Sequence, residues 1–366
     1  MLDNRLTNIF FLLLKSGLWK NAKSDSEIFP LTNQEWEDLY KISVNQTVEC
    51  IVFDGIQKLD PSNQPPRGLF LNWAVRVEKH GQRNIIMNEA IAKLHSLFNE
   101  NNGISSILLK GQGLAKCYDN PLRRICGDID LFFEDKSSYT KAFGIINDIG
   151  LEINSMPGFS SEYKFKGFEV EHHQKMFDIH NPFRNGVLNR IRLNEVNNYT
   201  TLNIDNKEIR LPSALETIIQ ANSHILKHLL SYGIGIRQLC DSARIYFYYS
   251  NELKNNDLKE LYSKLGVKKW IDLLHQLLVK YIGLDETFLP YPLNNRLNAD
   301  WMMEDILVAG NFGFHNENFK EKESDLKGAR ANKKSRIWSS FMKYVRVTPS
   351  EAIWFPIMQY YSRLKK

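Results

Sequence analysis

The sequence predicts an α+β fold in which a small mixed β-sheet lies between N- and C-terminal helical regions. Three stretches of the 366-residue chain indicate this order. Residues 1–100 carry apolar side chains at helical spacing, and residues 101–211 hold short apolar or alternating runs that are typical of strands. Residues 212–366 return to helical spacing. We therefore expect three structural units with these boundaries.

The N-terminal unit is expected to contain three helices. The first ends at about Ser16, and the second begins after Thr32, with Glu35 in its first turn. The third runs from about Leu69 to Glu100, because apolar residues recur there every three or four positions.

The middle unit begins with a strand, a glycine turn and a helix. Ile107 to Leu109 form a short apolar run typical of a buried strand, and Gly111 and Gly113 permit a tight turn after it. The backbone N–H groups of such a turn can approach a phosphate closely. Leu114–Tyr118 is expected to begin the following helix.

Two carboxylates follow at alternate positions. On a strand, Asp128 and Asp130 project from one face, roughly 6 to 7 Å apart, while Ile129 and Leu131 face the core. Oxygen ligands at this separation can jointly hold a hard cation such as Mg²⁺, which takes the rest of its shell from water and substrate phosphates. The alternative is a solvated strand face, but the glycine turn upstream favours a metal site.

These residues resemble a known family. Leu109-Lys110-Gly111, Arg124 and Gly127-Asp128-Ile129-Asp130-Leu131 resemble the LKG…R…GDIDL signature of a poorly characterised bacterial nucleotidyltransferase family of the DNA polymerase beta-like superfamily. Members of that family often accompany surface-polysaccharide genes. The resemblance is closest over residues 104–133. It continues more loosely through residues 167–173, 181–183 and 233–241.

The resemblance implies a function. The middle unit would be a nucleotidyltransferase core that moves a nucleoside monophosphate from an NTP to an unknown acceptor, with Mg²⁺, or Mn²⁺, at Asp128 and Asp130. Lys110, Gly111 and Arg124 would hold the triphosphate. The wider superfamily has Gly or Ser after the first glycine; this chain has Gln112, whose side chain is expected to donate a hydrogen bond to the nucleotide instead.

The superfamily pattern also implies a third carboxylate on a neighbouring strand. Alternation from Phe168 to His172 places Glu169 and Glu171 on one face. Glu171 is the first choice, as general base or as a completing metal ligand. Asp178, in a possible following strand, is the second choice, and a solvated strand face is the alternative for both glutamates.

The C-terminal unit begins with a capping box, Ser213 with Glu216, ahead of a long apolar stripe. Farther along, Arg237 and Asp241 are spaced i, i+4 on an expected helix. They form either a surface ion pair worth a few tenths of a kcal/mol or part of the site, where Arg237 would hold a nucleotide phosphate.

Two other functions compete with this one. His172, His173, Asp178 and His180 lie within nine residues and could serve a Zn²⁺ or Mn²⁺ phosphohydrolase. However, His172 and His173 point to opposite faces of a strand. The second competitor is a catalytically silent nucleotide-binding or interaction module. His224 and His228 lack the intervening glutamate of a metalloprotease motif, so we expect them to be packed or on the surface.

Whole-chain features limit the partners. The net charge of +5 suits anionic substrates but does not by itself indicate nucleic acid. The sequence predicts no transmembrane segment, and the basic stretch 320–346 gives only weak support for a peripheral membrane contact. Four cysteines without a CxxC pair are typical of buried free thiols in a reducing cytoplasm.

Overall fold

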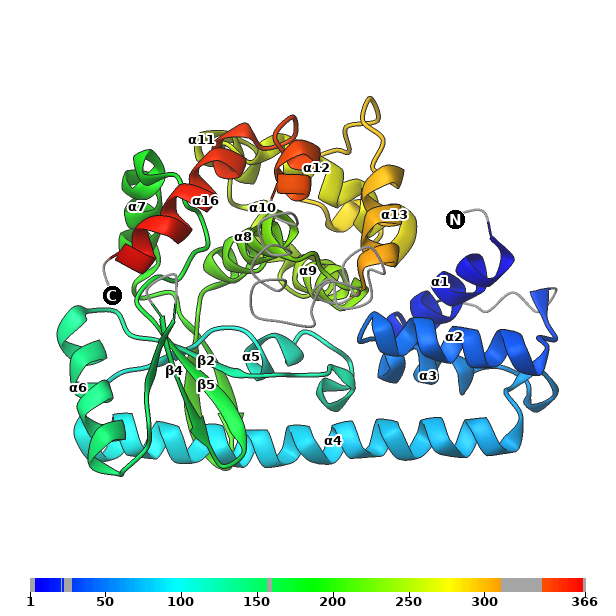
Figure 1. Ribbon diagram of the computed structural model, residues 1–366, viewed down its shortest axis with the longest axis horizontal. Coiled ribbons are helices and arrows are strands. Elements are labelled where there is room, and N and C mark those ends of the chain that lie inside the picture. The colour runs from blue at the N-terminus through cyan, green and yellow to red at the C-terminus, as the bar shows by residue number, and fades with distance from the viewer. Residues whose placement is uncertain (1–3, 21, 23–27, 157–159, 311–337, 365–366) are drawn as a thin grey trace.

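The fold is α+β, as the sequence predicts. The computed structural model describes residues 4–20, 22, 28–156, 160–310 and 338–364. Figure 1 shows a small sheet and a helical bundle lying above one long helix, with three shorter N-terminal helices at its far end. Among the described residues, no helix is both long enough and apolar enough to cross a bilayer.

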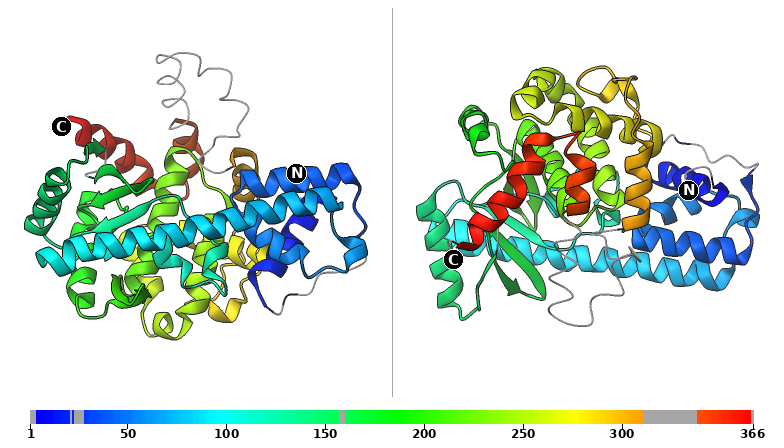
Figure 2. Two further views of the ribbon diagram at one scale, coloured as in Figure 1. Left: turned by 90° about the horizontal axis from the view of Figure 1, so that it is seen from below. Right: turned by 45° about the horizontal axis from the view of Figure 1, so that its top comes forward.

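The N-terminal helices end in one element that runs the length of the molecule. Helix α2 starts at a complete capping box between Thr32 and Glu35, which confirms the predicted start. The long helix α4 continues through a π-helical turn to Glu100. Figure 2, left, shows it crossing the whole face that is seen from below. The helices are α1 (Arg5–Leu18), α2 (Asn33–Asn45), α3 (Glu49–Ile56) and α4 (Arg67–His95).

The central sheet has five strands in the order β1-β2-β5-β4-β3. Strands β2 and β5 are parallel, and the other neighbours are antiparallel. The register sets Asp130 of β2 opposite Glu171 of β5, so both side chains lie on the same face. The strands are β1 (Ile107–Leu108), β2 (Ile129–Phe132), β3 (Asn154–Met156), β4 (Ser160–Phe165) and β5 (Phe168–His173).

A separate hairpin packs beside β1. Its strands, β6 (Thr200–Ile204) and β7 (Lys207–Leu211), are joined through Asp205 and Asn206, whose φ values of 50° and 61° are those of a type I′ turn. Helices α6 (Lys136–Asp148) and α7 (Asn185–Glu195) complete the middle region.

The C-terminal region is helical and packs on both earlier regions. Its first helix, α8, starts at the predicted capping box of Ser213 and Glu216. Helices α8 and α9 share one apolar core with α1, α2 and α3, whereas the sheet has a second core that includes the last turns of α4. The helices are α8 (Ala214–Ser231), α9 (Ile236–Tyr248), α10 (Ser250–Lys254), α11 (Leu258–Leu265), α12 (Lys268–Leu277), α13 (Asp300–Ala309) and α16 (Pro349–Leu364).

Some local predictions are corrected by the structure. The helix after the glycine turn, α5, is a single turn at Gln112–Ala115. The residues around Asp178 form no strand; they are irregular backbone between β5 and α7. Of the basic stretch, residues 320–337 lie outside the described residues, while Lys343 forms an ion pair with Asp305. All four cysteines are free and buried, as predicted.

Candidate active site

A pocket of about 260 Å³ opens where the sheet meets the C-terminal bundle, and we call it the main pocket. One wall comes from the β1–α5 turn and from strands β2 and β5, and the other comes from α8 and α9. The sheet wall supplies Lys110, Gly111, Asp128, Asp130 and Glu171; the helical wall supplies His224, Lys227, His228 and Arg237.

The glycine turn brings Lys110 against the carboxylates. Gly111 has φ of +53°, a region that glycine adopts readily, and a Cβ at this position would lie 3.0 Å from the Asp128 carbonyl oxygen. Lys110 Nζ lies 2.8 Å from Asp130 Oδ1. Burial opposes the charge of Lys110, but the Asp130, Asp128 and Glu171 carboxylates raise its pKa above the usual value. Lys110 is therefore a cation at neutral pH.

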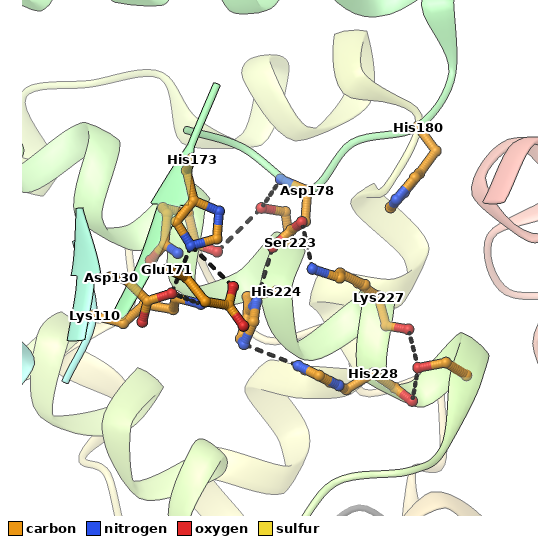
Figure 3. Close-up of polar contacts among 12 residues, drawn as sticks. Lys110, Asp130, Glu171, His173, Asp178, His180, Ser223, His224, Lys227 and His228 are labelled. Atoms are coloured by element: carbon orange, nitrogen blue, oxygen red, sulfur yellow. Dashed lines mark hydrogen bonds and ion pairs between the residues drawn. The ribbon is translucent and has the colours of Figure 1, made fainter. Parts of the chain in front are cut away.

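Asp130, Glu171 and His173 converge on the same face of the sheet (Figure 3). His173 Nε2 lies 2.6 Å from Asp130 Oδ1 and 3.3 Å from Glu171 Oε2. Burial works against ionisation of Asp130, but the charge of Lys110 and the hydrogen bond with His173 lower its pKa below the usual value. Burial, and then the charge of Asp130, raise the pKa of Glu171. Asp130 is therefore kept ionised, whereas Glu171 is brought closer to protonation.

Asp128 lies one residue before β2 and faces the main pocket. The negative charge of Asp130, and then burial, raise its pKa. The two aspartates therefore interact electrostatically, as closely spaced carboxylates do.

The residues present suit a divalent cation. Asp130 is 1% exposed, and its Oδ2 atom has no hydrogen-bond partner among the described residues. An unpartnered buried carboxylate oxygen is costly unless a cation or donor satisfies it. Asp130, Glu171 and His173 offer ligand atoms that all lie within 4.8 Å of one another. These three residues form the donor set of a candidate metal centre, and Asp128 lines the same pocket.

Helix α8 supplies a chain of polar contacts on the opposite wall (Figure 3). His224 Nδ1 donates to Asp178 Oδ2 over 2.8 Å, and Lys227 Nζ lies 3.0 Å from Asp178 Oδ1. His228 Nε2 lies 2.9 Å from His224 Nε2. Burial, and then the charge of Lys110, lower the pKa of His224 to about 4. These histidines are neutral at pH 7, and they line the main pocket rather than being the packed or surface residues that we expected.

Two predicted nucleotide ligands are engaged elsewhere. Arg124 borders the main pocket, but its Nε and Nη2 atoms donate to the two carboxylate oxygens of Asp241 over 2.7 and 2.8 Å. Gln112 is buried, and its amide donates to Asn84 Oδ1 over 3.0 Å. Both side chains are thus held by contacts within the protein, and their assignment as nucleotide ligands stays a prediction.

The expected Arg237–Asp241 pair does not form as a surface ion pair. Asp241 is buried against Arg124, and Arg237 Nη1 donates to the Ile125 carbonyl oxygen over 2.6 Å. Arg237 lines the main pocket, and its Nε atom is buried with no hydrogen-bond partner among the described residues. Arg237 thus lies at the main pocket and not in a surface ion pair with Asp241.

The histidine cluster considered from the sequence is not one site. His172 packs among aromatic rings on the far side of the sheet, where burial lowers its pKa to about 3. His173 joins Asp130, and His180 bonds to Glu351 of α16. Asp178 pairs with Lys227 and His224. A phosphohydrolase centre built from these four residues has no support in this geometry.

Sequence reasoning missed the contribution of α8 and the position of His173 in the site. The i, i+4 spacing of His224 and His228 shows that they share a helix face, but nothing in the sequence shows what that face covers. Strand alternation puts His173 and His172 on opposite faces of the sheet. That alternation was the one signal that could have placed His173 beside Glu171.

One of three comparisons with known proteins identifies the family. A family model described as "Uncharacterised nucleotidyltransferase" matches residues 32–283. The crystal structure of an antigenic nucleotidyltransferase-like protein from Paracoccidioides brasiliensis aligns with 60% of this chain and 96% of its own chain, at 18% identity and a TM-score of 0.35. No curated protein matches the chain.

Proposed function

This chain belongs to the uncharacterised nucleotidyltransferase family, and on that premise we propose that it transfers a nucleoside monophosphate from an NTP to an acceptor, with release of pyrophosphate. The observation that carries the proposal is the convergence of Asp128, Asp130 and Glu171 with the cations Lys110 and Arg237 in the main pocket. Acidic ligands for a metal and basic ligands for phosphate are the two requirements of this reaction.

Asp128 and Asp130 are the proposed ligands of Mg²⁺ or Mn²⁺. When bound, such an ion neutralises charge on the phosphates and orients the reacting phosphoryl group. The orphaned Oδ2 atom of Asp130 supports this assignment, because it is buried and points to no donor among the described residues.

Lys110 and Arg237 are the proposed ligands of the triphosphate, with the backbone of Gly111 beside them. Both side chains border the main pocket, from opposite walls. The Nε atom of Arg237 has no hydrogen-bond partner within the described part of the chain, and a guanidinium can bind two phosphate oxygens at once. Arg124 is left out of this proposed set because its guanidinium donates hydrogen bonds to both carboxylate oxygens of Asp241.

Glu171 is the proposed general base, or the carboxylate that completes the metal shell. It lies opposite Asp130 in the parallel strand pair and lines the main pocket. Burial and the Asp130 charge raise its pKa, which brings the carboxylate closer to the range in which a base is efficient. Asp178, the second choice, is neutralised by Lys227 and hydrogen-bonded by His224, so it is less able to accept a proton.

The proposed acceptor is a hydroxyl or phosphate of a small molecule or saccharide. A role in surface-polysaccharide metabolism follows from the family resemblance, and a cytoplasmic location follows from the free cysteines; both are part of the proposal.

The test is an assay with α-labelled NTPs, Mg²⁺ or Mn²⁺, and a panel of sugar phosphates and alcohols. We expect a labelled product and pyrophosphate. Glu171→Gln should lower the rate by about 100-fold or more while nucleotide binding is retained, and Asp178→Asn should have a smaller effect. Metal-dependent NTP binding without any labelled product would instead support the silent binding module.

A further inference from the structure

His173 is the one side chain at the carboxylate cluster that the proposed reaction leaves without a role. It belongs to β5, two residues after Glu171, so strand alternation puts both side chains on the face that carries Asp130. Its side chain is 14% exposed, and Figure 3 shows its ring directed at the two carboxylates.

The spacing of the three ligand atoms matches the edges of a metal coordination shell. Bonds of about 2.1 Å at right angles place neighbouring ligand atoms about 3.0 Å apart. The distances from His173 Nε2 to Asp130 Oδ1 and Glu171 Oε2, 2.6 and 3.3 Å, lie on either side of that value. The ligand atoms of all three residues lie within 4.8 Å of one another.

An independent observation points to a cation at this cluster. Asp130 Oδ2 is buried and unpartnered among the described residues, while Oδ1 of the same carboxylate already contacts Lys110 and His173. Lys110 therefore satisfies only one of the two oxygens. A divalent ion that binds the carboxylate through both of its oxygens would satisfy the other.

We propose that His173 Nε2 is a direct ligand of the divalent ion held by Asp130 and Glu171, which makes this a mixed nitrogen–oxygen site. The proposal rests on the proposed function only in expecting an ion at Asp130. His173 must then carry its proton on Nδ1, so that the Nε2 lone pair faces the ion.

A nitrogen ligand changes which metal the protein prefers. Mg²⁺ is a hard ion that takes oxygen ligands, whereas imidazole favours first-row transition metals. The site should therefore bind Mn²⁺ more tightly than Mg²⁺, by a margin that depends on His173. A residue that only orients Asp130 through a hydrogen bond would leave the choice of metal to the carboxylates.

The experiment is pulsed electron paramagnetic resonance of the full-length protein with Mn²⁺ as the only added metal and no nucleotide. Directly bound nitrogen gives a ¹⁴N coupling to the Mn²⁺ electron spin, and labelling all histidines with ¹⁵N should replace it with a ¹⁵N coupling in the unaltered protein. His173→Gln should abolish this coupling. His224→Gln, which changes another histidine of the same pocket, should retain it.

A binding measurement gives a second readout. Competition between Mg²⁺ and Mn²⁺ should show the Mn²⁺ preference of the unaltered protein falling by about tenfold in His173→Asp, in which an oxygen ligand replaces nitrogen. Bound Mn²⁺ without histidine coupling, together with an unchanged metal preference in His173→Asp, would overturn the proposal. Neither outcome depends on turnover, so failure of the inference is distinct from failure of the proposed reaction.

Discussion

Asp130 is the residue on which most of the site depends. Its carboxylate is 1% exposed, lies 2.8 Å from Lys110 Nζ and 2.6 Å from His173 Nε2, and faces Glu171 across the parallel strand pair. A buried carboxylate needs a cation nearby, because burial alone disfavours its charged form. Lys110 is the only lysine or arginine in an ion pair with Asp130 among the described residues. Lys110 and the proposed metal ion would therefore act on the same carboxylate.

At this scale we predict that Lys110→Met increases the response to metal. The variant leaves Asp130 without its ammonium partner and should destabilise the metal-free protein by about 3 kcal/mol or more. Mg²⁺ or Mn²⁺ should restore part of that loss, so the rise in melting temperature on adding metal should be larger than in the unaltered protein. Thermal denaturation with and without metal measures this difference.

Lys116→Met is a matched control. Lys116 lies six residues away and donates to the Thr201 carbonyl oxygen, outside the main pocket. It should show the same metal response as the unaltered protein. A smaller response in Lys110→Met than in the control would mean that Lys110 does not share Asp130 with the ion.

Among the elements, the loop that leads into β2 is held from two sides. Asn84 of α4 donates to the carbonyl oxygens of Leu122 and Arg124, and Arg237 of α9 donates to that of Ile125. The Arg124–Asp241 pair ties the same loop to α9. These contacts fix the loop that precedes Asp128. The helical regions therefore help to set the position of the carboxylates.

We predict that Asp241→Asn weakens the protein while Arg237→Gln mainly weakens nucleotide binding. Asp241→Asn leaves the buried Arg124 guanidinium uncompensated and should lower the free energy of unfolding by about 3–5 kcal/mol. Arg237 is partly exposed, so Arg237→Gln should lower the free energy of unfolding by less. The same substitution removes a proposed phosphate ligand. Urea unfolding and nucleotide titration separate the two effects. Equal stability losses in both variants would contradict the distinct roles.

The sequence predicts the elements of the site better than their mutual contacts. The strand around Asp130, the capping box of α8 and the turn at Asp205 depend on residues close in the chain, so their signals are local. The partner of Asp241 depends on how α9 packs against a loop more than 110 residues earlier. Helical spacing therefore suggested Arg237 as that partner, whereas tertiary packing selects Arg124.

For the whole molecule, α4 runs past both the N-terminal helices and the sheet (Figure 2) and contributes to two apolar cores. Trp73 and Val77 of its first half belong to the core shared by the N- and C-terminal helices, and Ala90 and Leu94 belong to the core of the sheet. The main pocket opens where the sheet core meets the bundle. The proposed division into units 1–100, 101–211 and 212–366 stays a prediction, and limited proteolysis tests it.

We predict that stability falls on acidification from about pH 6.5. Burial lowers the pKa of His172 and His275 to about 3 and that of His224 to about 4, and it also lowers the pKa of His228. Histidines of the unfolded chain take up protons near pH 6.5, before these buried ones do. The unfolded state then binds more protons, so each histidine removes up to about 1.4 kcal/mol per pH unit between that pH and its folded pKa.

Urea unfolding at pH 7 and pH 5 measures this loss. Carboxyl groups with a raised pKa oppose this loss: Asp54, whose pKa burial raises to about 6, and also Asp128, Glu171 and Glu216. His275→Gln removes one buried histidine that does not line the main pocket and should reduce the pH dependence without altering metal binding. A stability that is equal or greater at pH 5 would show that these histidines are protonated in the folded protein.

The central claim is that the main pocket binds an NTP through a metal at the aspartates. The most direct measurement is the equilibrium binding of a non-hydrolysable NTP, with and without Mn²⁺, to the unaltered protein and to Asp128→Ala/Asp130→Ala. We predict Mn²⁺-dependent binding to the unaltered protein and a loss of affinity of at least about tenfold in the double variant. Binding that needs no metal, or that is equal in the folded double variant, would contradict the claim.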